Sequence, residues 1–425
     1  MSTDDWLTTG YQHIWMPYTQ MQTAPTPLKV RATKGTRIIL DDGRELIDGI
    51  ASWWSACHGY NHPHIREAMI RQLKTMPHVM LAGLSNEPAF TLAARLAALT
   101  PGDLNRVFLS ESGSVSVEIA MKMAVQYWLN SGHTGKNKFI AFTNGYHGDT
   151  IGTMAVGDPN NIMHGPFHGL TAEQLVIEIP TNDAAFDAFD AYLAGNAERL
   201  AGVVMEPLVQ GAGGMLFHDT EVVRQIRSSC DAHNVLLILD EIMVGFGRLG
   251  TMFACDLAAV VPDIMTLSKS LTGGTLPLAA TIASDKIFDT FLDNQLEKCL
   301  MHGPTFSGNA LAAAAANASL DLFESEPRLA QVVAIAEHFD RALATCIEIP
   351  GVVDVRVRGA IGVIQLSKLG DMYWIRQRFI EEGIWLRPFG NIVYAMPAYT
   401  ISPVELTAVT DSMIQIVGEW SKRYG

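Results

Sequence analysis

Two apolar runs, each followed by an ionisable residue, constrain the fold of this chain more than any other feature. The first run is Val235-Leu-Leu-Ile-Leu before Asp240, and the second is Ile264-Met-Thr-Leu-Ser before Lys269. Short runs of this kind predict strands that are buried on both faces of a parallel sheet. Ligands of such sheets bind beyond the carboxyl ends of the strands. The two runs therefore predict that a carboxylate and an amine lie close together at that edge.

The pattern around these runs predicts an α/β fold with a mainly parallel sheet. Apolar strands alternate with helical segments, and such alternation places helices on both faces of a sheet. The other expected strands are 107–110, 138–143, 202–206 and 276–284, and the helices between them are 115–129 and 221–233.

The pattern changes after about residue 327, which predicts a separate small α+β domain. We expect a helix over 328–346, strands at 352–357 and 361–366, a helix near 371–382 and a final strand pair between Trp385 and Met396. Near the N-terminus, 29–33 and 36–40 predict a hairpin, followed by a turn at 41–44. The expected division is a large domain over 51–327 and a small domain over 328–425, against which segment 1–50 packs.

Charge and composition exclude several classes of protein. The formal net charge is −14 and no basic run occurs, so binding to nucleic acid or to an anionic membrane is not expected. No apolar run reaches the roughly 20 residues that span a bilayer. The cysteines are five in number without a Cys-x-x-Cys pair, and the N-terminus does not resemble a signal peptide. We expect a cytoplasmic protein with reduced thiols.

Asp240 and Lys269 have the chemistry that pyridoxal 5'-phosphate (PLP) requires of a protein. A lysine amine forms a Schiff base with an aldehyde, and a carboxylate keeps a ring nitrogen protonated. Other interpretations stay open for each residue alone. Lys269 could be a lysine at a loop edge, and Asp240 could cap the following turn or pair with Arg248.

Three further segments suit a flat phosphate ester. Ser112-Gly113-Ser114 precedes a helix, whose N-terminal N–H groups bind anions. Tyr146 and His147, in Asn144-Gly-Tyr-His-Gly-Asp-Thr150, could press against a ring. Thr305, in a loop after His302, could donate to phosphate. A helix cap, a tight turn and a capped loop are the respective alternatives.

Other motifs are too weak to indicate a site. His58 and His62 have no carboxylate at ligand spacing, so we expect no metal. Gly211-Ala-Gly-Gly does not match the dinucleotide-binding pattern, and Gly132-His-Thr-Gly-Lys is too short for a P-loop.

Taken in order, these motifs resemble the class III (ω-amino) aminotransferases of PLP fold type I over nearly the whole chain. The resemblance implies a large domain with a seven-stranded sheet, a smaller domain and a homodimer with active sites at the subunit interface. It implies that Lys269 holds PLP and moves protons, that Asp240 pairs with the ring nitrogen, and that Tyr146 takes part in catalysis. The remaining cofactor contacts that it implies are Ser112, Gly113, Ser114, His147, Glu206, Pro304 and Thr305, the last from the other subunit.

A narrower resemblance concerns the members of this family that aminate 8-amino-7-oxononanoate with S-adenosylmethionine in biotin biosynthesis. It is carried by Trp15-Met-Pro-Tyr-Thr19, Ser52-Trp-Trp54 and Trp385-Leu-Arg-Pro-Phe-Gly390. The resemblance implies that Arg387 binds the substrate carboxylate. It implies that the pocket around the substrates contains Tyr18, Trp53, Trp54, Tyr146, Lys269, Gly303 and Tyr394.

The expected function is therefore a transaminase with two half-reactions. Another ω-aminotransferase, acting on diamines or β-amino acids, is the main alternative. A PLP aminomutase and a non-catalytic PLP-binding regulator are further alternatives. The regulator would need a basic DNA-binding segment, and none is visible.

Overall fold

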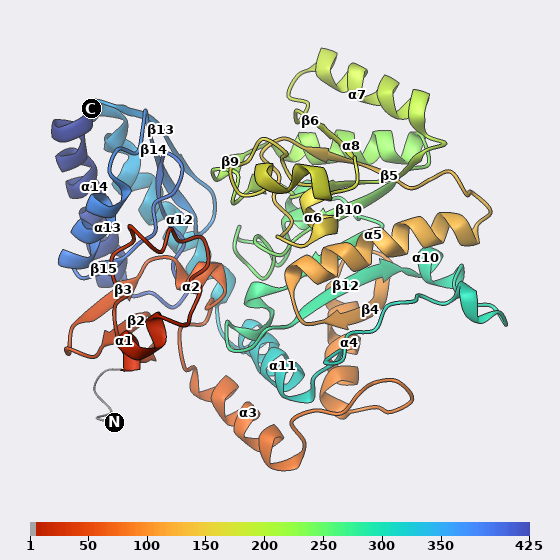
Figure 1. Cartoon of the computed structure of the whole chain (residues 1–425), viewed down its shortest axis with the longest axis horizontal. Coiled ribbons are helices and arrows are strands. Elements are labelled where there is room, and N and C mark those ends of the chain that lie inside the picture. The colour runs from red at the N-terminus through yellow and green to blue at the C-terminus, as the bar shows by residue number, and fades with distance from the viewer. Residues whose placement is uncertain (1–5) are drawn as a thin grey trace.

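The centre of the protein is a seven-stranded sheet (Figure 1). The computed structural model describes residues 6–425, apart from the side chain of His168. The strand order is β4-β12-β11-β10-β7-β5-β6. The strands are β4 (Leu104–Ser110), β5 (Lys138–Phe142), β6 (Leu175–Ile177), β7 (Leu200–Met205), β10 (Leu236–Asp240), β11 (Ile264–Leu267) and β12 (Ala279–Ser284).

The sheet is mainly parallel, which confirms the predicted fold class. The pairs β10–β11, β10–β7, β7–β5 and β5–β6 are parallel. β12 is antiparallel to both of its neighbours, β11 and β4. Six strands therefore run in one direction and end at one edge of the sheet.

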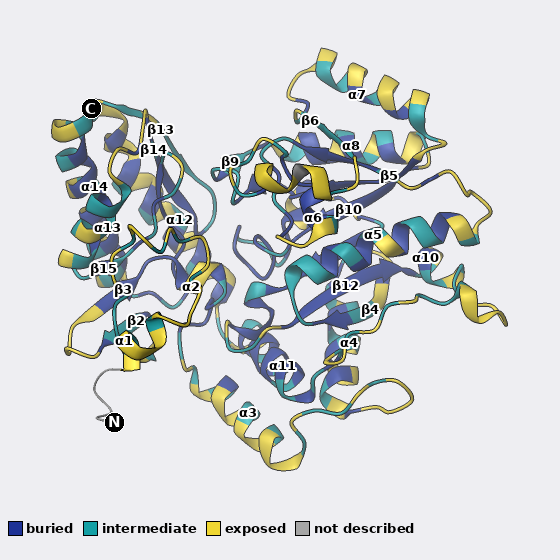
Figure 2. Cartoon of the chain, viewed as in Figure 1, coloured by how far each residue is buried: buried dark blue, intermediate teal, exposed yellow. Residues whose placement is uncertain are grey.

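Helices cover both faces of this sheet, which explains why its central strands, β7, β10 and β11, are buried along their whole length. On β10, Leu236 and Ile238 pack in the cluster that contains helix α5 (Gly113–Asn130). Leu237 and Leu239 belong to the cluster on the opposite face, with helix α8 (Thr220–Ala232). Figure 2 shows the sheet as the most deeply buried layer.

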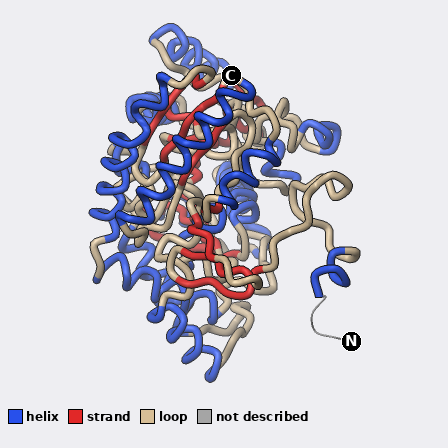
Figure 3. The backbone as a smooth tube through the Cα atoms, turned by 90° about the vertical axis from the view of Figure 1, so that its left-hand side faces the viewer, coloured by secondary structure: helices blue, strands red, loops and turns tan. Residues whose placement is uncertain are grey.

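A second group of elements lies to one side of this sheet and comes from the C-terminal part of the chain. The antiparallel sheet β13 (Val352–Val357), β14 (Gly362–Leu366) and β16 (Ile392–Ala395) packs with α12 (Arg328–Leu343). Helix α14 (Pro403–Tyr424) contacts both α12 and α13 (Met372–Glu381). Figure 3 faces this side of the molecule and shows its helices beside the strands.

The N-terminal strands form a third sheet together with one C-terminal strand. The expected hairpin is present as β1 (Val30–Lys34) and β2 (Arg37–Leu40), and it continues into β3 (Glu45–Asp48). The expected final strand pair between Trp385 and Met396 is wrong. β15 (Ile384–Trp385) pairs in parallel with β3, whereas β16 pairs with β14. The segment between β15 and β16 thus passes from one sheet to the other.

No helix in the described part of the chain is both long and apolar enough to cross a membrane.

The remaining elements connect and cover these sheets. These elements are α1 (Trp6–Tyr11), α2 (Ala51–Trp54), α3 (Pro63–Thr75), α4 (Glu87–Leu99), α6 (Ile151–Ala155), η2 (Gly165–Leu170), α7 (Asp183–Asn196), β8 (Val209–Gln210), β9 (Leu216–Phe217), α9 (Ala254–Ala258), η3 (Lys269–Thr272), α10 (Asp285–Asp289), η4 (Leu296–Lys298), α11 (Ala310–Ser325) and η5 (Ala344–Glu348).

Candidate active site

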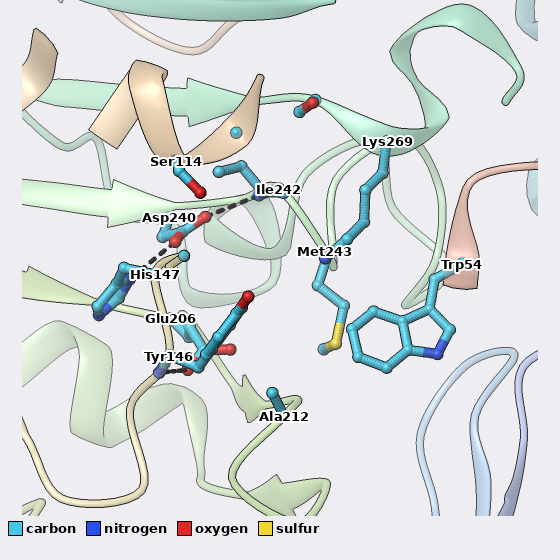
Figure 4. Close-up of a pocket in the computed structure, with 13 residues that line it drawn as sticks. Trp54, Ser114, Tyr146, His147, Glu206, Ala212, Asp240, Ile242, Met243 and Lys269 are labelled. Atoms are coloured by element: carbon cyan, nitrogen blue, oxygen red, sulfur yellow. Dashed lines mark hydrogen bonds and ion pairs between the residues drawn. The ribbon is translucent and has the colours of Figure 1, made fainter. Parts of the chain in front are cut away.

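The carboxyl ends of the parallel strands surround a cavity of about 170 Å³ (Figure 4). Asp240 ends β10, Lys269 follows β11 by two residues, and Glu206 follows β7 directly. The chain after β5, the N-terminus of α5, the end of α2 and the turn after β8 complete the wall. The lining residues are Trp54, Gly113, Ser114, Tyr146, His147, Gly148, Glu206, Ala212, Asp240, Ile242, Met243, Ser268 and Lys269.

A buried hydrogen bond to His147 holds the Asp240 carboxylate in place. His147 Nδ1 lies 2.7 Å from Asp240 Oδ2, and the N–H of Ile242 donates to Oδ1 at 3.0 Å. Burial lowers the pKa of His147, but the hydrogen bond and the charges of Asp240 and Glu206 outweigh it and raise that pKa. Arg248 donates instead to the Pro397 carbonyl. Asp240 thus presents a fixed negative charge to the cavity.

Lys269 lies in the cavity wall in a strained conformation. Its φ angle of 42° falls in the left-handed region, which a residue with a side chain rarely adopts. Its Nζ lies 4.5 Å from the centre of the Trp54 ring. Burial lowers the pKa of the amine to about 8, although Asp240 and Glu206 oppose that shift. A larger share of Lys269 is therefore neutral, and able to act as nucleophile or base, than of an ordinary lysine near neutral pH.

Glu206 ties two loops of the cavity together. Its carboxylate accepts the N–H of Tyr146 at 3.0 Å and that of Gly211 at 2.9 Å. Burial raises the pKa of Glu206 to about 7, against the charge of His147. Glu206 therefore fixes the loop that carries Tyr146 and His147.

The N-terminus of α5 opens into the cavity. Gly113 and Ser114 line it, while the Ser112 side chain accepts the N–H of Val115 and caps the helix. Gly148 lies so close to this turn that a Cβ there would come within 2.0 Å of Ser114 Oγ. The turn leaves backbone N–H groups and a hydroxyl for an anion.

Tyr146 belongs to a polar cluster that includes a residue not singled out from the sequence. Its hydroxyl bonds to Tyr18 and donates to Asp149, and its ring stacks on His164 with ring centres 5.6 Å apart. Tyr18 also donates to Asp149. Asp149 lies inside the 144–150 motif, and its position in that turn could have marked it as a candidate site residue. Contact of Tyr146 with a bound ring stays a prediction.

Aromatic and basic side chains continue the site beyond the cavity. The guanidinium of Arg387 lies 5.0 Å from the ring centre of Trp53, and Tyr18 meets the same indole edge-on at 6.2 Å. Trp54 Nε1 donates to Tyr394 Oη at 3.3 Å. Three segments that are far apart in the sequence, at residues 18, 53–54 and 387–394, therefore meet here.

The loop Gly303-Pro304-Thr305 is not in the wall of this cavity. Thr305 is exposed, and its carbonyl accepts from His78 Nε2 at 3.1 Å. The expected contacts of these three residues with cofactor or substrate stay predictions.

The donor set in the cavity fits PLP. Lys269 supplies an amine for the aldehyde, the buried Asp240 supplies a charge for the ring nitrogen, and the α5 N-terminus supplies donors for the phosphate. In residues 6–425 no group of three or more His, Cys, Asp or Glu side chains is placed to hold a metal ion.

Comparisons with known proteins identify the family. The family model for class-III aminotransferases matches residues 18–417. An adenosylmethionine-8-amino-7-oxononanoate aminotransferase from Buchnera aphidicola subsp. Acyrthosiphon pisum (strain APS) is 42% identical over 408 residues, which are 94% of this chain and 95% of that protein.

Solved structures with the same fold include two aminotransferases. The adenosylmethionine-8-amino-7-oxononanoate aminotransferase of Methanocaldococcus jannaschii DSM 2661 is 34% identical, with a TM-score of 0.92 over 97% of this chain and 98% of that one. An amine transaminase from an uncultivated Pseudomonas species, solved in a PLP-bound form, is 28% identical, with a TM-score of 0.87 over 96% of this chain and 99% of that one.

Proposed function

The chain belongs to the class-III aminotransferases, and we propose that it transfers the amino group of S-adenosylmethionine to the ketone of 8-amino-7-oxononanoate. The expected fold, PLP fold type I, is confirmed by the seven-stranded sheet and by the solved relatives. The relatives of 34–42% identity described above carry the name of this activity. The observation that carries the proposal is the position of Lys269 in a cavity that also contains the Asp240–His147 pair.

PLP is the cofactor for which these residues are suited. When bound, PLP supplies an aldehyde that accepts amines and a ring that withdraws electrons. Lys269 would hold the aldehyde carbon, Asp240 the ring nitrogen, and Gly113 with Ser114 the phosphate.

The protein's own groups then move the protons. In the donor half-reaction, Lys269 Nζ removes the proton from the amine-bearing carbon of S-adenosylmethionine. In the acceptor half-reaction, it returns a proton to the former ketone carbon. A pKa of about 8 suits both tasks near neutral pH, because an effective acid–base catalyst titrates near the working pH.

Arg387 and the aromatic residues around it explain the choice of acceptor. Among the described residues Arg387 has no carboxylate partner, and it faces Trp53. A guanidinium fork of this kind suits the terminal carboxylate of the acceptor. Trp53, Trp54 and Tyr18 form apolar walls for its alkyl chain and for the adenosyl group.

A second copy of the chain completes the site in this proposal. Large apolar side chains are exposed beside the Thr305 loop, and such patches mark interfaces. They are Met80, Met301 and Phe306, which lie within a few positions of Thr305 or of His78, its hydrogen-bond partner. The partner subunit's Thr305 would reach the phosphate that Gly113 and Ser114 bind.

The proposal also keeps the expected division of the chain into an N-terminal segment (1–50), a large domain (51–327) and a small domain (328–425).

A half-reaction spectrum tests the function. The PLP-loaded protein is mixed with S-adenosylmethionine alone, and the visible absorption of the cofactor is followed. The proposal expects the band to disappear and to return when 8-amino-7-oxononanoate is added. If the band is lost with a diamine or a β-amino acid but not with S-adenosylmethionine, the amino donor is that amine and not S-adenosylmethionine. Failure of 8-amino-7-oxononanoate to restore the band would remove the acceptor assignment.

A further inference from the structure

The segment that carries both substrate-pocket tryptophans is a turn of left-handed helix. Ala51, Ser52, Trp53 and Trp54 have φ angles of 46°, 46°, 55° and 72°. The N–H of Trp54 bonds to the Ile50 carbonyl at 2.8 Å, so the turn is closed as in a helix. No glycine relieves it. Four consecutive side chains in this region cost several kcal/mol together, at about 1–2 kcal/mol each, so other contacts must hold the turn.

The buried carboxylate of Asp48 holds this turn from its N-terminal side. Asp48 Oδ1 accepts the N–H of Ile50 at 2.9 Å, and Oδ2 accepts the N–H of Ser52 at 2.8 Å. Tyr60 Oη donates to Oδ2 at 2.5 Å and also bonds to Ser52 Oγ. Among the described residues Asp48 forms no ion pair, and it is only 1% exposed. A buried carboxylate without a cation depends on such donors, so the turn and Asp48 stabilise one another.

The turn controls both ends of the active site. Trp54 lies against Lys269 and bonds to Tyr394, and Ser270, the neighbour of Lys269, donates to the Trp54 carbonyl at 3.2 Å. Trp53 projects to the other end, where it meets Arg387. In an ordinary right-handed turn, these two adjacent side chains would leave the backbone in other directions.

We propose that Asp48 is a positioning residue, which sets the substrate pocket by holding residues 51–54 in the left-handed conformation. The proposal rests on the proposed function for the identity of the substrates, but its geometry does not depend on them. Asp48 does not touch the reacting atoms. It acts through Trp53 and Trp54, and it therefore affects the binding of substrates more than the chemical step.

Asp48→Asn is the first test, because the amide keeps the shape but loses one acceptor and the charge. The KM for the acceptor should rise about tenfold, the usual effect of losing a buried hydrogen bond to a charged group, and kcat should change less. Asp42→Asn is the matched control, since Asp42 is exposed and within residues 6–425 pairs only with Arg44. Tyr60→Phe, which removes one donor and leaves both N–H groups, should have a smaller effect than Asp48→Asn. A fall in kcat with an unchanged KM in Asp48→Asn would overturn the proposal.

Rescue by glycine separates positioning from general stability. Ala51→Gly lowers the cost of the left-handed conformation. Added to Asp48→Asn, it should lower the raised KM by about three- to fivefold. No recovery in this double-mutant cycle would contradict the proposal. If Asp48→Asn alone does not fold, the same comparison is made between Tyr60→Phe and its Ala51→Gly double variant.

A readout without substrate keeps this test independent of the proposed function. The near-ultraviolet circular dichroism of the wild type minus that of Trp54→Phe isolates the signal of this indole. Asp48→Asn should lose most of that signal, and Ala51→Gly should restore part of it. An intact Trp54 signal in Asp48→Asn would overturn the positioning role, even if S-adenosylmethionine and 8-amino-7-oxononanoate proved not to be the substrates.

Discussion

At the scale of single residues, the site consists of charges whose surroundings set their protonation. Asp240 receives hydrogen bonds from His147 and from a backbone N–H, so its carboxylate is held in place. Lys269 has no comparable partner among the described residues and faces an indole instead. The protein thus fixes the position of the carboxylate, and burial lowers the pKa of the amine, as the proposed role of Lys269 requires.

The burial of Lys269 predicts a stability cost that depends on pH. Its pKa is about 8 in the folded protein and 10.5 when unperturbed. Below pH 8 both states bind the proton and the full cost is present. Between pH 8 and 10.5 the unfolded state binds more protons, so the cost falls as pH rises. Lys269→Met in cofactor-free protein should therefore be more stable at pH 7 by about 2–3 kcal/mol.

Denaturant unfolding of both proteins at pH 7 and pH 10 checks this prediction. The difference in free energy of unfolding should shrink at pH 10. A constant difference would show that the lysine is not destabilised by burial. The same variant should lose at least about 10³-fold in single-turnover rate, since it lacks both nucleophile and base.

Arg387 predicts a selective loss of acceptor binding. Arg387→Ala should weaken the apparent binding of the acceptor, raising its KM about ten- to a hundredfold, because a charged hydrogen-bond partner of its carboxylate is lost. The matched control is Arg378→Ala, whose guanidinium pairs with Glu381, Glu382 and Glu419. Steady-state kinetics at varied acceptor concentration measures both. An unchanged acceptor KM in Arg387→Ala would refute its role.

At the scale of elements, the site depends on loops that meet beyond the ends of the strands. The loop after β5 and the N-terminus of α5 approach so closely that only glycine fits between them. Gly148 has a φ of 126°, which side chains rarely adopt, and a Cβ there would clash with Ser114. The proposed phosphate site would thus be formed by two elements in contact rather than by the helix alone.

Gly148→Ala tests this contact. The new methyl group should push the loop away from α5 and weaken the retention of PLP by about tenfold or more, because the phosphate donors move apart. The control is Gly132→Ala, which also has a positive φ but has nothing within 4 Å of its added Cβ. PLP release on dilution, followed by absorbance, measures the effect. Equal retention in both variants would exclude this role for the contact.

At the scale of the whole molecule, the residues expected to bind the cofactor lie in two separate places on one subunit. Lys269 and Asp240 line the cavity, whereas Thr305 is exposed on a face that also presents large apolar side chains. Both facts follow if a second copy covers this face and delivers its Thr305 loop to the phosphate site.

Complementation between inactive subunits tests this arrangement. Lys269→Ala and Thr305→Ala homodimers should each be impaired, Lys269→Ala fully. If the sites are shared, a heterodimer of the two contains one site with both defects and one site with neither. Activity should therefore rise above the mean of the two parents after the subunits are unfolded and refolded together. If it does not rise, Thr305 and Lys269 do not belong to one shared site.

Local pattern was enough to predict six of the seven strands of the central sheet, whereas β6 was missed. In runs such as 235–239 and 264–268, apolar side chains point to both faces of the sheet, because helices cover both faces. The residue types alone therefore indicate that these strands are buried. Since parallel strands end at one edge, the meeting of Asp240 and Lys269 followed from the same pattern. The roles assigned to individual site residues stay predictions.

Tertiary structure decided the contacts between segments that are far apart in the chain. His147 and Asp240 are separated by 93 positions, and nothing near either residue specifies their hydrogen bond. The assignment of β15 to the N-terminal sheet was missed because pairing partners of a two-residue strand are set by the sheets around it. The left-handed turn at residues 51–54 was not predicted either, because its strain is balanced by Asp48 and Tyr60. The sequence alone thus determined which elements form and where their reactive ends lie. Packing between distant segments decided which charges are paired and which conformations are held.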